Sequence, residues 1–235
     1  MQRKLMNESF VIRKRSRNGE DRHSNSRMNF FRDLDFNLAE HVEFFQAFIR
    51  EPASVGALSP SSRSLAKAMI QGFVLQKADT VIEIGPGTGA FTGLIRERIG
   101  KKTTFITLEL DCLYARSLKR RFPNLVVYND SAERMQDYLA LHGKQKANYI
   151  ISGLPWATLP LGVQNRVMDA VLTSLAPDGV FTTFAYLHAR WLPKAVQFRR
   201  NLELHFDRVE TSPVVWGNLP PAFVYRCTRS KARPS

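Results

Sequence analysis

Short apolar runs alternate with segments of helical periodicity along most of this chain. Runs rich in β-branched and aromatic residues predict strands at 80–84, 104–108, 125–128, 147–151, 180–186, 206–210 and 222–226. Apolar residues recur at helical spacing between them, which predicts helices at 91–99, 113–122, 131–139, 161–175 and 193–202. Strands that alternate with helices in this way predict an α/β domain built on a mostly parallel sheet.

Two segments of different character precede this alternation. Residues 1–32 are rich in Lys, Arg, Ser and Asn without a sustained period, which predicts a flexible basic arm. Residues 33–75 contain an amphipathic helix at 34–49 and a second helix start at Ser61 or Ser62. The amphipathic helix either lies in a membrane interface or packs against the domain, and the basic arm either docks or is simply solvated.

The composition indicates a globular protein that attracts polyanions. The 235 residues are 44% hydrophobic, and 34 Lys and Arg against 21 Asp and Glu give a formal charge of +13. Such a charge favours a nucleic acid or an anionic lipid surface as the partner and does not choose between them. No apolar run reaches the roughly 20 residues that span a bilayer, so a cytoplasmic protein is expected. Cys112 and Cys227 lie far apart without metal-ligand spacing, so neither a disulfide framework nor a metal site is predicted.

A strand that runs into three alternating glycines is the strongest chemical signal in the chain. From Glu83 onward the sequence reads Glu-Ile-Gly-Pro-Gly-Thr-Gly, and its glycines are Gly85, Gly87 and Gly89. Glycines at this spacing allow a tight turn and the close approach of a ligand to the backbone, and the spacing alone also fits a dinucleotide-binding turn. A carboxylate at Glu83 faces a positively charged ligand group better than it faces a pyrophosphate. This favours S-adenosylmethionine (SAM), which carries ammonium and sulfonium charges, as the cofactor.

Further polar residues stand where the next strands end. Glu109 lies 20 positions after the last of these glycines, the spacing at which nucleotide-binding α/β units hold ribose hydroxyls through a carboxylate. Asp130 can accept a hydrogen bond from the adenine amino group while the amide of Ser131 donates to a ring nitrogen. Asp130 also suits an ordinary helix cap. Ser152 ends the fourth strand, so all these side chains are expected along one edge of the sheet together with Glu83.

With these residues the chain resembles the class I SAM-dependent methyltransferases. The resemblance rests on the motif from Glu83 to Gly89. It implies a Rossmann-like α/β fold with a seven-stranded, mostly parallel sheet and an antiparallel edge pair at the C-terminal end. It places the methyltransferase domain at residues 76–230. The helix start at Ser61 would offer its exposed amides to the carboxylate of SAM.

Three further segments are similar to bacterial phospholipid N-methyltransferases, which are related in fold to rRNA adenine dimethyltransferases. They are Val55-Gly-Ala-Leu-Ser-Pro-Ser-Ser62, Ser152-Gly-Leu-Pro155 and Val215-Trp-Gly-Asn-Leu-Pro-Pro221. The resemblance covers nearly everything from residue 40 onward. It implies SAM-dependent methylation of phosphatidylethanolamine toward phosphatidylcholine, by an enzyme bound peripherally to an anionic membrane surface.

The loop after the fourth predicted strand is expected to lie beside the methyl donor. Its residues Ser152, Gly153 and Leu154 are therefore candidate cofactor contacts. Nucleobase methyltransferases often carry N/D-P-P-Y or N-L-P-Y here, and a glycine at 153 has no side chain to hold an exocyclic amine. This makes nucleic acid the less favoured substrate. The alternatives that stay open are an rRNA adenine N6-dimethyltransferase, an enzyme for another aminolipid such as ornithine lipid, and a binding module without turnover.

Aromatic and basic side chains are the candidates for the substrate half of the site. The fully methylated headgroup is a quaternary ammonium, which aromatic faces favour, and Trp156, Tyr186 and Trp216 are candidates to line its pocket. The substrate amine must lose a proton before it attacks. Tyr186 or His188, either directly or through a water molecule, is the candidate acceptor of that proton.

Overall fold

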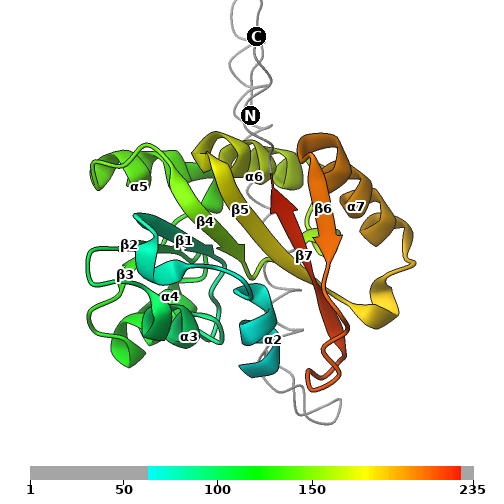
Figure 1. The fold of residues 1–235 in the computed structure, drawn as a ribbon, viewed down its shortest axis with the longest axis horizontal. Coiled ribbons are helices and arrows are strands. Elements are labelled where there is room, and N and C mark those ends of the chain that lie inside the picture. Colours follow the sequence, from blue (N-terminus) through cyan, green and yellow to red (C-terminus); the bar gives the residue numbers. More distant parts are fainter. Residues whose placement is uncertain (1–62, 229–235) are drawn as a thin grey trace, which may run out of the picture. The chain divides into compact units, whose positions relative to one another are not determined.

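A seven-stranded sheet forms the centre of the computed structural model, which describes residues 63–228 (Figure 1). Its strands lie in the order β3-β2-β1-β4-β5-β7-β6. Their bounds are Thr80–Ile84 (β1), Thr104–Leu108 (β2), Val126–Tyr128 (β3), Ala147–Ser152 (β4), Leu175–Tyr186 (β5), Arg208–Thr211 (β6) and Ala222–Thr228 (β7).

Helices connect these strands, as the alternating pattern predicts. The α-helices are Arg63–Met69 (α2), Thr92–Arg98 (α3), Cys112–Arg121 (α4), Met135–Leu141 (α5), Leu161–Ser174 (α6) and Pro193–His205 (α7). Short 3₁₀ turns are Leu75–Lys77 (η1), Ala132–Arg134 (η2), Trp156–Thr158 (η3) and Leu187–Ala189 (η4).

The pairing of the strands confirms the predicted class. β1 pairs in parallel with β2 and β4, β2 with β3, and β4 with β5. β7 is antiparallel to both β5 and β6, which makes the predicted antiparallel pair at the edge of the sheet. β1 lies in the middle of the parallel part, and all five of its residues are buried, as its β-branched sequence predicts.

The two faces of the sheet are covered by different helices. Alternate residues of a strand point to opposite faces. Ile82 and Ile84 accordingly pack in a core with residues of α5, α6 and α7, whereas Val81 packs in a second core with residues of α2, α3 and α4. In Figure 1 these two groups of helices lie on opposite sides of the strands. We call them the α5–α7 face and the α2–α4 face.

Most elements differ from the predicted boundaries by a few residues at their ends, and two differ in an informative way. The helix expected at 131–139 begins as η2, because the Ser131 side chain accepts a hydrogen bond from the Glu133 amide (3.2 Å), and continues as α5. β5 begins at Leu175, directly after α6, so it is five residues longer than the strand predicted at 180–186. The Ala-Pro-Asp-Gly sequence at 176–179 is typical of a turn. The sequence pattern therefore does not predict the first part of this strand.

Part of the N-terminal segment belongs to the sheet's own core. Leu65, Ala66 and Met69 of α2 are buried in the core of the α2–α4 face. The basic arm at 1–32, the amphipathic helix predicted at 34–49 and the candidate cofactor contact Ser61 lie outside the described residues. Within residues 63–228, no helix combines the length and the apolar character needed to cross a membrane.

Candidate active site

The glycine turn after β1 is built so that one side of it stays open. Gly85, Gly87 and Gly89 all have positive φ values, of 64°, 53° and 83°. A Cβ at Gly85 would lie 2.5 Å from the Leu154 Cδ2 atom, and one at Gly89 would lie 2.8 Å from the Leu118 Cδ2 atom. A Cβ at Gly87 would meet no described atom within 4 Å. The outer glycines therefore allow close packing, and the middle one leaves backbone accessible to a ligand.

Glu83 is fully buried beneath this turn. Its Oε2 atom accepts a hydrogen bond from Thr92 Oγ1 on α3 (2.8 Å), whereas Oε1 accepts none from any residue in the described part of the chain. Burial raises the pKa of Glu83 to about 8, the Thr92 hydrogen bond opposes this rise, and the nearby Glu109 carboxyl adds to it. A cation placed next to Oε1 would supply the missing partner and favour the ionised carboxylate.

Glu109 lies just beyond β2 and reaches the glycine turn. Its two oxygens accept hydrogen bonds from the amides of Gly87 (2.8 Å) and Asp111 (2.9 Å). Burial raises the pKa of the Glu109 carboxyl, although these amide hydrogen bonds oppose the rise. Asp111 caps α4 by accepting from the amides of Leu113 and Tyr114. Glu109 thus holds the turn, and a ligand hydroxyl that bound this carboxylate would compete with the Gly87 amide.

Asp130, just after β3, accepts hydrogen bonds from three nearby residues of the chain. Its Oδ2 atom accepts from Tyr138 Oη (2.6 Å) and Arg134 Nη1 (2.9 Å), and Oδ1 accepts from the Ser131 amide (2.7 Å). Burial acts to raise the pKa of Asp130, but these hydrogen bonds and the Arg134 charge prevail and lower it. Asp130 is therefore ionised at neutral pH. The residue that caps η2 is Ser131, so the helix-cap interpretation of Asp130 does not apply.

Two residues that the sequence did not single out hold this edge together. Thr92 fixes the Glu83 carboxyl from α3. Asn129 donates from Nδ2 to the carbonyls of Glu109 (2.9 Å) and Leu110 (2.8 Å), which ties the end of β3 to the end of β2. The position of Asn129 between β3 and Asp130 is the only sequence signal of this role.

The loop after β4 packs against the glycine turn. The Gly153 amide donates to the Ile84 carbonyl (2.8 Å), and a Cβ at Gly153 would lie 2.3 Å from the Gly85 carbonyl oxygen. Leu154 packs over Gly85 from this loop. Residue 153 therefore has to be glycine because two backbone segments meet there, so a nucleobase-binding asparagine does not fit without a shift of the backbone.

Trp156 lies in the core and not at the open edge. It is 2% exposed, its indole stacks on Phe198 of α7 (5.2 Å between ring centroids), and its Nε1 atom donates to Ser152 Oγ (2.9 Å). These contacts place it in the core of the α5–α7 face. The expectation that Trp156 offers a free aromatic face to a substrate cation is therefore corrected: packing already covers the ring. Ser152 serves to orient that indole and the Leu154 amide.

Tyr186 and His188 lie on the face that carries the glycine turn. Ring contacts run from Phe91, beside the turn, through Phe184 (5.9 Å) to Tyr186 (5.5 Å) and on to His188 (5.8 Å). The Tyr186 ring packs against the core of the α2–α4 face, and burial raises the pKa of its phenol. A phenol with a raised pKa keeps its proton at neutral pH, so exposed His188 is the better candidate base of the two.

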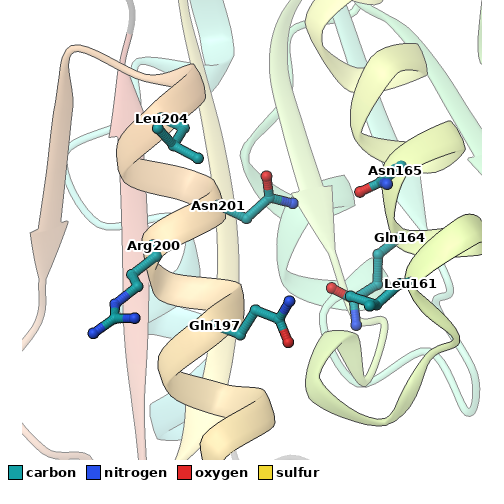
Figure 2. Close-up of a pocket in the computed structure, with 7 residues that line it drawn as sticks. All are labelled: Leu161, Gln164, Asn165, Gln197, Arg200, Asn201 and Leu204. Atoms are coloured by element: carbon teal, nitrogen blue, oxygen red, sulfur yellow. The ribbon is translucent and has the colours of Figure 1, made fainter.

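A groove lies between α6 and α7 (Figure 2). It has a volume of about 240 Å³ and is lined by Leu161, Gln164, Asn165, Gln197, Arg200, Asn201 and Leu204. It belongs to the α5–α7 face, whereas the glycine turn leads into α3 on the opposite face. We therefore do not include it in the candidate active site.

A curated relative decides between the kinds of α/β protein that this geometry allows. The chain is 30% identical to the ornithine lipid N-methyltransferase of Singulisphaera acidiphila over 187 residues, which cover 78% of this chain and 93% of that protein. The chain belongs to the class I SAM-dependent methyltransferases. No protein-family model matches the methyltransferase.

Solved structures share the fold of this methyltransferase. The O-methyltransferase TomG from Streptomyces achromogenes, in complex with SAM, has a TM-score of 0.56 at 16% identity and covers 81% of this chain and 89% of TomG. A TehB-like SAM-dependent methyltransferase from Corynebacterium glutamicum has a TM-score of 0.54 at 15% identity, with 82% and 99% of the two chains covered. Spermidine synthase from Thermotoga maritima shares the fold as well, with a TM-score of 0.57 at 14% identity over 73% of this chain and 62% of that one. The fold alone therefore does not fix the substrate.

The residues at the edge of the sheet fit SAM, the methyl donor of this superfamily. Glu83 has a buried oxygen that lacks a partner among the described residues, and the backbone at Gly87 is open to a ligand. A cationic nucleoside with an amino-acid tail meets both requirements. Among residues 63–228, no three His, Cys, Asp or Glu side chains are grouped as metal ligands would be.

Proposed function

We propose that this methyltransferase transfers methyl groups from SAM to the primary amine of an aminolipid headgroup at an anionic membrane surface. The observation that carries the proposal is the 30% identity to an ornithine lipid N-methyltransferase over 93% of that protein's length. The formal charge of +13 supports an anionic surface as the place of the reaction.

Ornithine lipid and phosphatidylethanolamine are the two acceptors to compare. The motifs Ser152-Gly-Leu-Pro155 and Val215-Trp-Gly-Asn-Leu-Pro-Pro221 favour phosphatidylethanolamine by their resemblance to phospholipid N-methyltransferases. The curated relative favours ornithine lipid, which we place first because the similarity extends over most of both chains. Both headgroups present a primary amine to the same site, so the chemistry is shared.

Separate residues of the chain would bind the cofactor and accept the proton of the substrate amine. SAM supplies an electrophilic methyl group on a sulfonium centre, so the main task of the protein is alignment and exclusion of water. Glu83 would neutralise positive charge on the cofactor, while Glu109 and Asp130 would hold its ribose and adenine. His188 would accept the proton that the substrate ammonium must lose, directly or through water. Tyr186, next to His188, would face the substrate cation with its ring.

The geometry of the loop after β4 weighs against a nucleobase as substrate. An asparagine at this position would orient an exocyclic amine, but Gly153 lies too close to the Gly85 carbonyl for any side chain. An rRNA adenine dimethyltransferase is thus a weaker proposal than an aminolipid methyltransferase. The exposed Lys and Arg side chains would suit either partner, which is why the acceptor must be tested directly.

A labelling experiment tests the proposal. The purified full-length chain is incubated with SAM labelled in the methyl group and with ornithine lipid, phosphatidylethanolamine or ribosomal subunits. We expect label in the lipid, and more of it when an anionic phospholipid is present. Glu83→Gln should abolish incorporation, and Glu97→Gln, an exposed change on α3, should leave it intact. Label confined to RNA would overturn the proposal, and so would SAM binding without label in any acceptor.

A further inference from the structure

We infer that two loops at the carboxyl edge of the sheet form a membrane-docking surface, which inserts apolar side chains between the headgroups of anionic lipids. This docking surface consists of Trp191 and Leu192, between η4 and α7, and Trp216 and Leu219, between β6 and β7. The inference rests on the proposed function, because a lipid surface is where an aminolipid substrate would lie.

The side chains of the docking surface are large, apolar and exposed. Trp191 is 77% exposed, Trp216 is 72%, Leu192 is 57% and Leu219 is 52%. Two of the three tryptophans of the chain are thus exposed here, while Trp156 is in the core. Tryptophan is enriched at the boundary between lipid and water, because its ring is apolar and its N–H still finds a polar partner there.

Contacts between the two loops place these side chains on one edge. The Leu187 amide at the start of η4 donates to the Pro221 carbonyl at the end of the β6–β7 loop (2.8 Å). The Arg190 guanidinium lies 5.0 Å from the Trp191 ring centroid and 5.8 Å from that of Phe223, so it bridges the η4–α7 loop and β7. Figure 1 shows both loops at the same end of β5 and β7. The two loops that carry the docking surface are therefore joined to each other at this edge.

The position of this edge relative to the candidate active site supports a lipid partner. β5 ends at Tyr186, directly before the η4–α7 loop, so Tyr186 and His188 adjoin the docking surface. A membrane bound there would bring headgroups to the edge where the candidate base lies. The alternative position for an apolar surface, at the opposite end of α7, offers Leu204, which is exposed but lies far along the helix from His188.

The charge of the same segments is complementary to anionic lipid. Residues 187–202 contain Arg190, Lys194, Arg199 and Arg200 and no Asp or Glu, although Arg199 pairs with Glu203 (2.9 Å), and residues 211–225 contain no charged residue of either sign. The β6–β7 loop also lies beside the start of α2, since a Cβ at Gly217 would be 3.5 Å from Ser64 Oγ. Apolar side chains rimmed by basic ones are typical of peripheral membrane-binding surfaces.

Vesicle binding by the full-length chain tests the inference. The probe is sedimentation with vesicles of phosphatidylcholine mixed with phosphatidylglycerol, compared with pure phosphatidylcholine. We expect the double variant Trp191→Ala, Leu192→Ala to weaken binding about tenfold or more, and Trp216→Ala to weaken it by a similar factor. Lys194→Gln should cost about fivefold, and only on the anionic vesicles. Tryptophan fluorescence should shift to shorter wavelength on binding and should shift less in each Trp variant.

Matched controls distinguish binding through this surface from non-specific binding to lipid. Leu204→Ala removes an exposed leucine (82%) near the other end of α7, and Lys101→Gln removes an exposed lysine after α3. Both should leave vesicle binding unchanged. Equal losses in the Trp191→Ala, Leu192→Ala variant and in Leu204→Ala would overturn the inference. Two other outcomes would also overturn the inference, each with vesicle binding unchanged in the Trp191 variants. One is a change of oligomeric state in light scattering. The other is a change in the protease sensitivity of residues 1–62.

Activity in two lipid forms distinguishes this inference from the proposed function. The Trp191→Ala, Leu192→Ala variant should methylate aminolipid dispersed in detergent micelles at the wild-type rate, and aminolipid in vesicles more slowly. Equal rates on vesicles for variant and wild type would reject the docking surface alone. If the wild-type chain methylated lipid in neither form, the proposed function would fail, whatever the vesicle-binding results.

Discussion

The two halves of the carboxyl edge of the sheet differ in almost every physical property. At the ends of β1 and β2, carboxylates are buried and held by hydrogen bonds, as with Glu83 to Thr92 and Glu109 to Gly87, and after β3 the partly buried Asp130 is also held by hydrogen bonds. At the ends of β5 and β6, the loops carry exposed tryptophans and leucines and no acidic residue. The first half is polar and hydrogen-bonded, and the second is apolar and exposed.

This difference separates what a methyltransferase shares with its superfamily from what is its own. The cofactor is the same for all members, so the half that would hold it can be built from local motifs with a fixed geometry. The acceptor varies, and its half is built from loops that tolerate new side chains. If the comparison is correct, changes in the first half will affect cofactor binding, and changes in the second will affect the acceptor or the membrane.

The largest effect is expected from Glu83. Glu83→Gln removes the only charge that the buried Oε1 atom can offer to a cation, so we expect SAM affinity to fall about 100-fold or more. Isothermal titration calorimetry measures this directly. Glu97→Gln, an exposed acidic residue on α3, is the control and should bind SAM normally. Equal affinity of wild type and Glu83→Gln would end the assignment of Glu83 to the cofactor.

A change of His188 should act on the acceptor half without weakening SAM binding. We expect His188→Asn to lower kcat about 100-fold at neutral pH, because the substrate ammonium then loses its proton only to bulk solvent. The deficit should shrink in alkaline buffer, where free amine forms without help. A rate profile against pH measures both effects. A deficit that stayed constant with pH would assign His188 to a structural role.

The contact between the glycine turn and the loop after β4 predicts a loss of stability at one glycine. Gly153→Asn forces a Cβ toward the Gly85 carbonyl oxygen, and we expect the free energy of unfolding to fall by about 1–3 kcal/mol, with weaker SAM binding. Gly143→Asn is the control, because a Cβ there meets no described atom within 4 Å and asparagine tolerates its positive φ of 65°. Urea denaturation compares the two. Equal stability of both variants would show that the loops can separate freely.

A pH dependence of stability in the absence of SAM tests the burial of Glu83. Burial raises the pKa of Glu83 from 4.5 to about 8, so the folded chain holds this proton more tightly than the unfolded chain. The stabilisation is complete below pH 4.5 and is lost as the pH rises through 8. The slope contributed by this group reaches about 1.4 kcal/mol per pH unit. Urea denaturation across this range should show the slope in wild type and not in Glu83→Gln. Parallel curves would mean that Glu83 titrates normally.

The sequence alone determined most of the fold and supplied the candidate cofactor residues. β-branched runs located strands such as β1 and β2, because burial and chain stiffness act on a few neighbouring residues. The motif from Glu83 to Gly89 located the turn, since positive φ values and a strand-end carboxylate are local properties. The formal charge likewise depends only on composition.

Only the tertiary structure decided what distant segments do to one another. It placed the Trp156 ring against α7, where no motif indicates its face, and it brought the Gly153 backbone against Gly85, which explains a glycine that sequence reasoning interpreted only as a missing side chain. It also brought two separate loops together around Trp191 and Trp216. The physical reason is that exposure and partners depend on packing between residues far apart in the chain, whereas strand and turn preferences depend on neighbours.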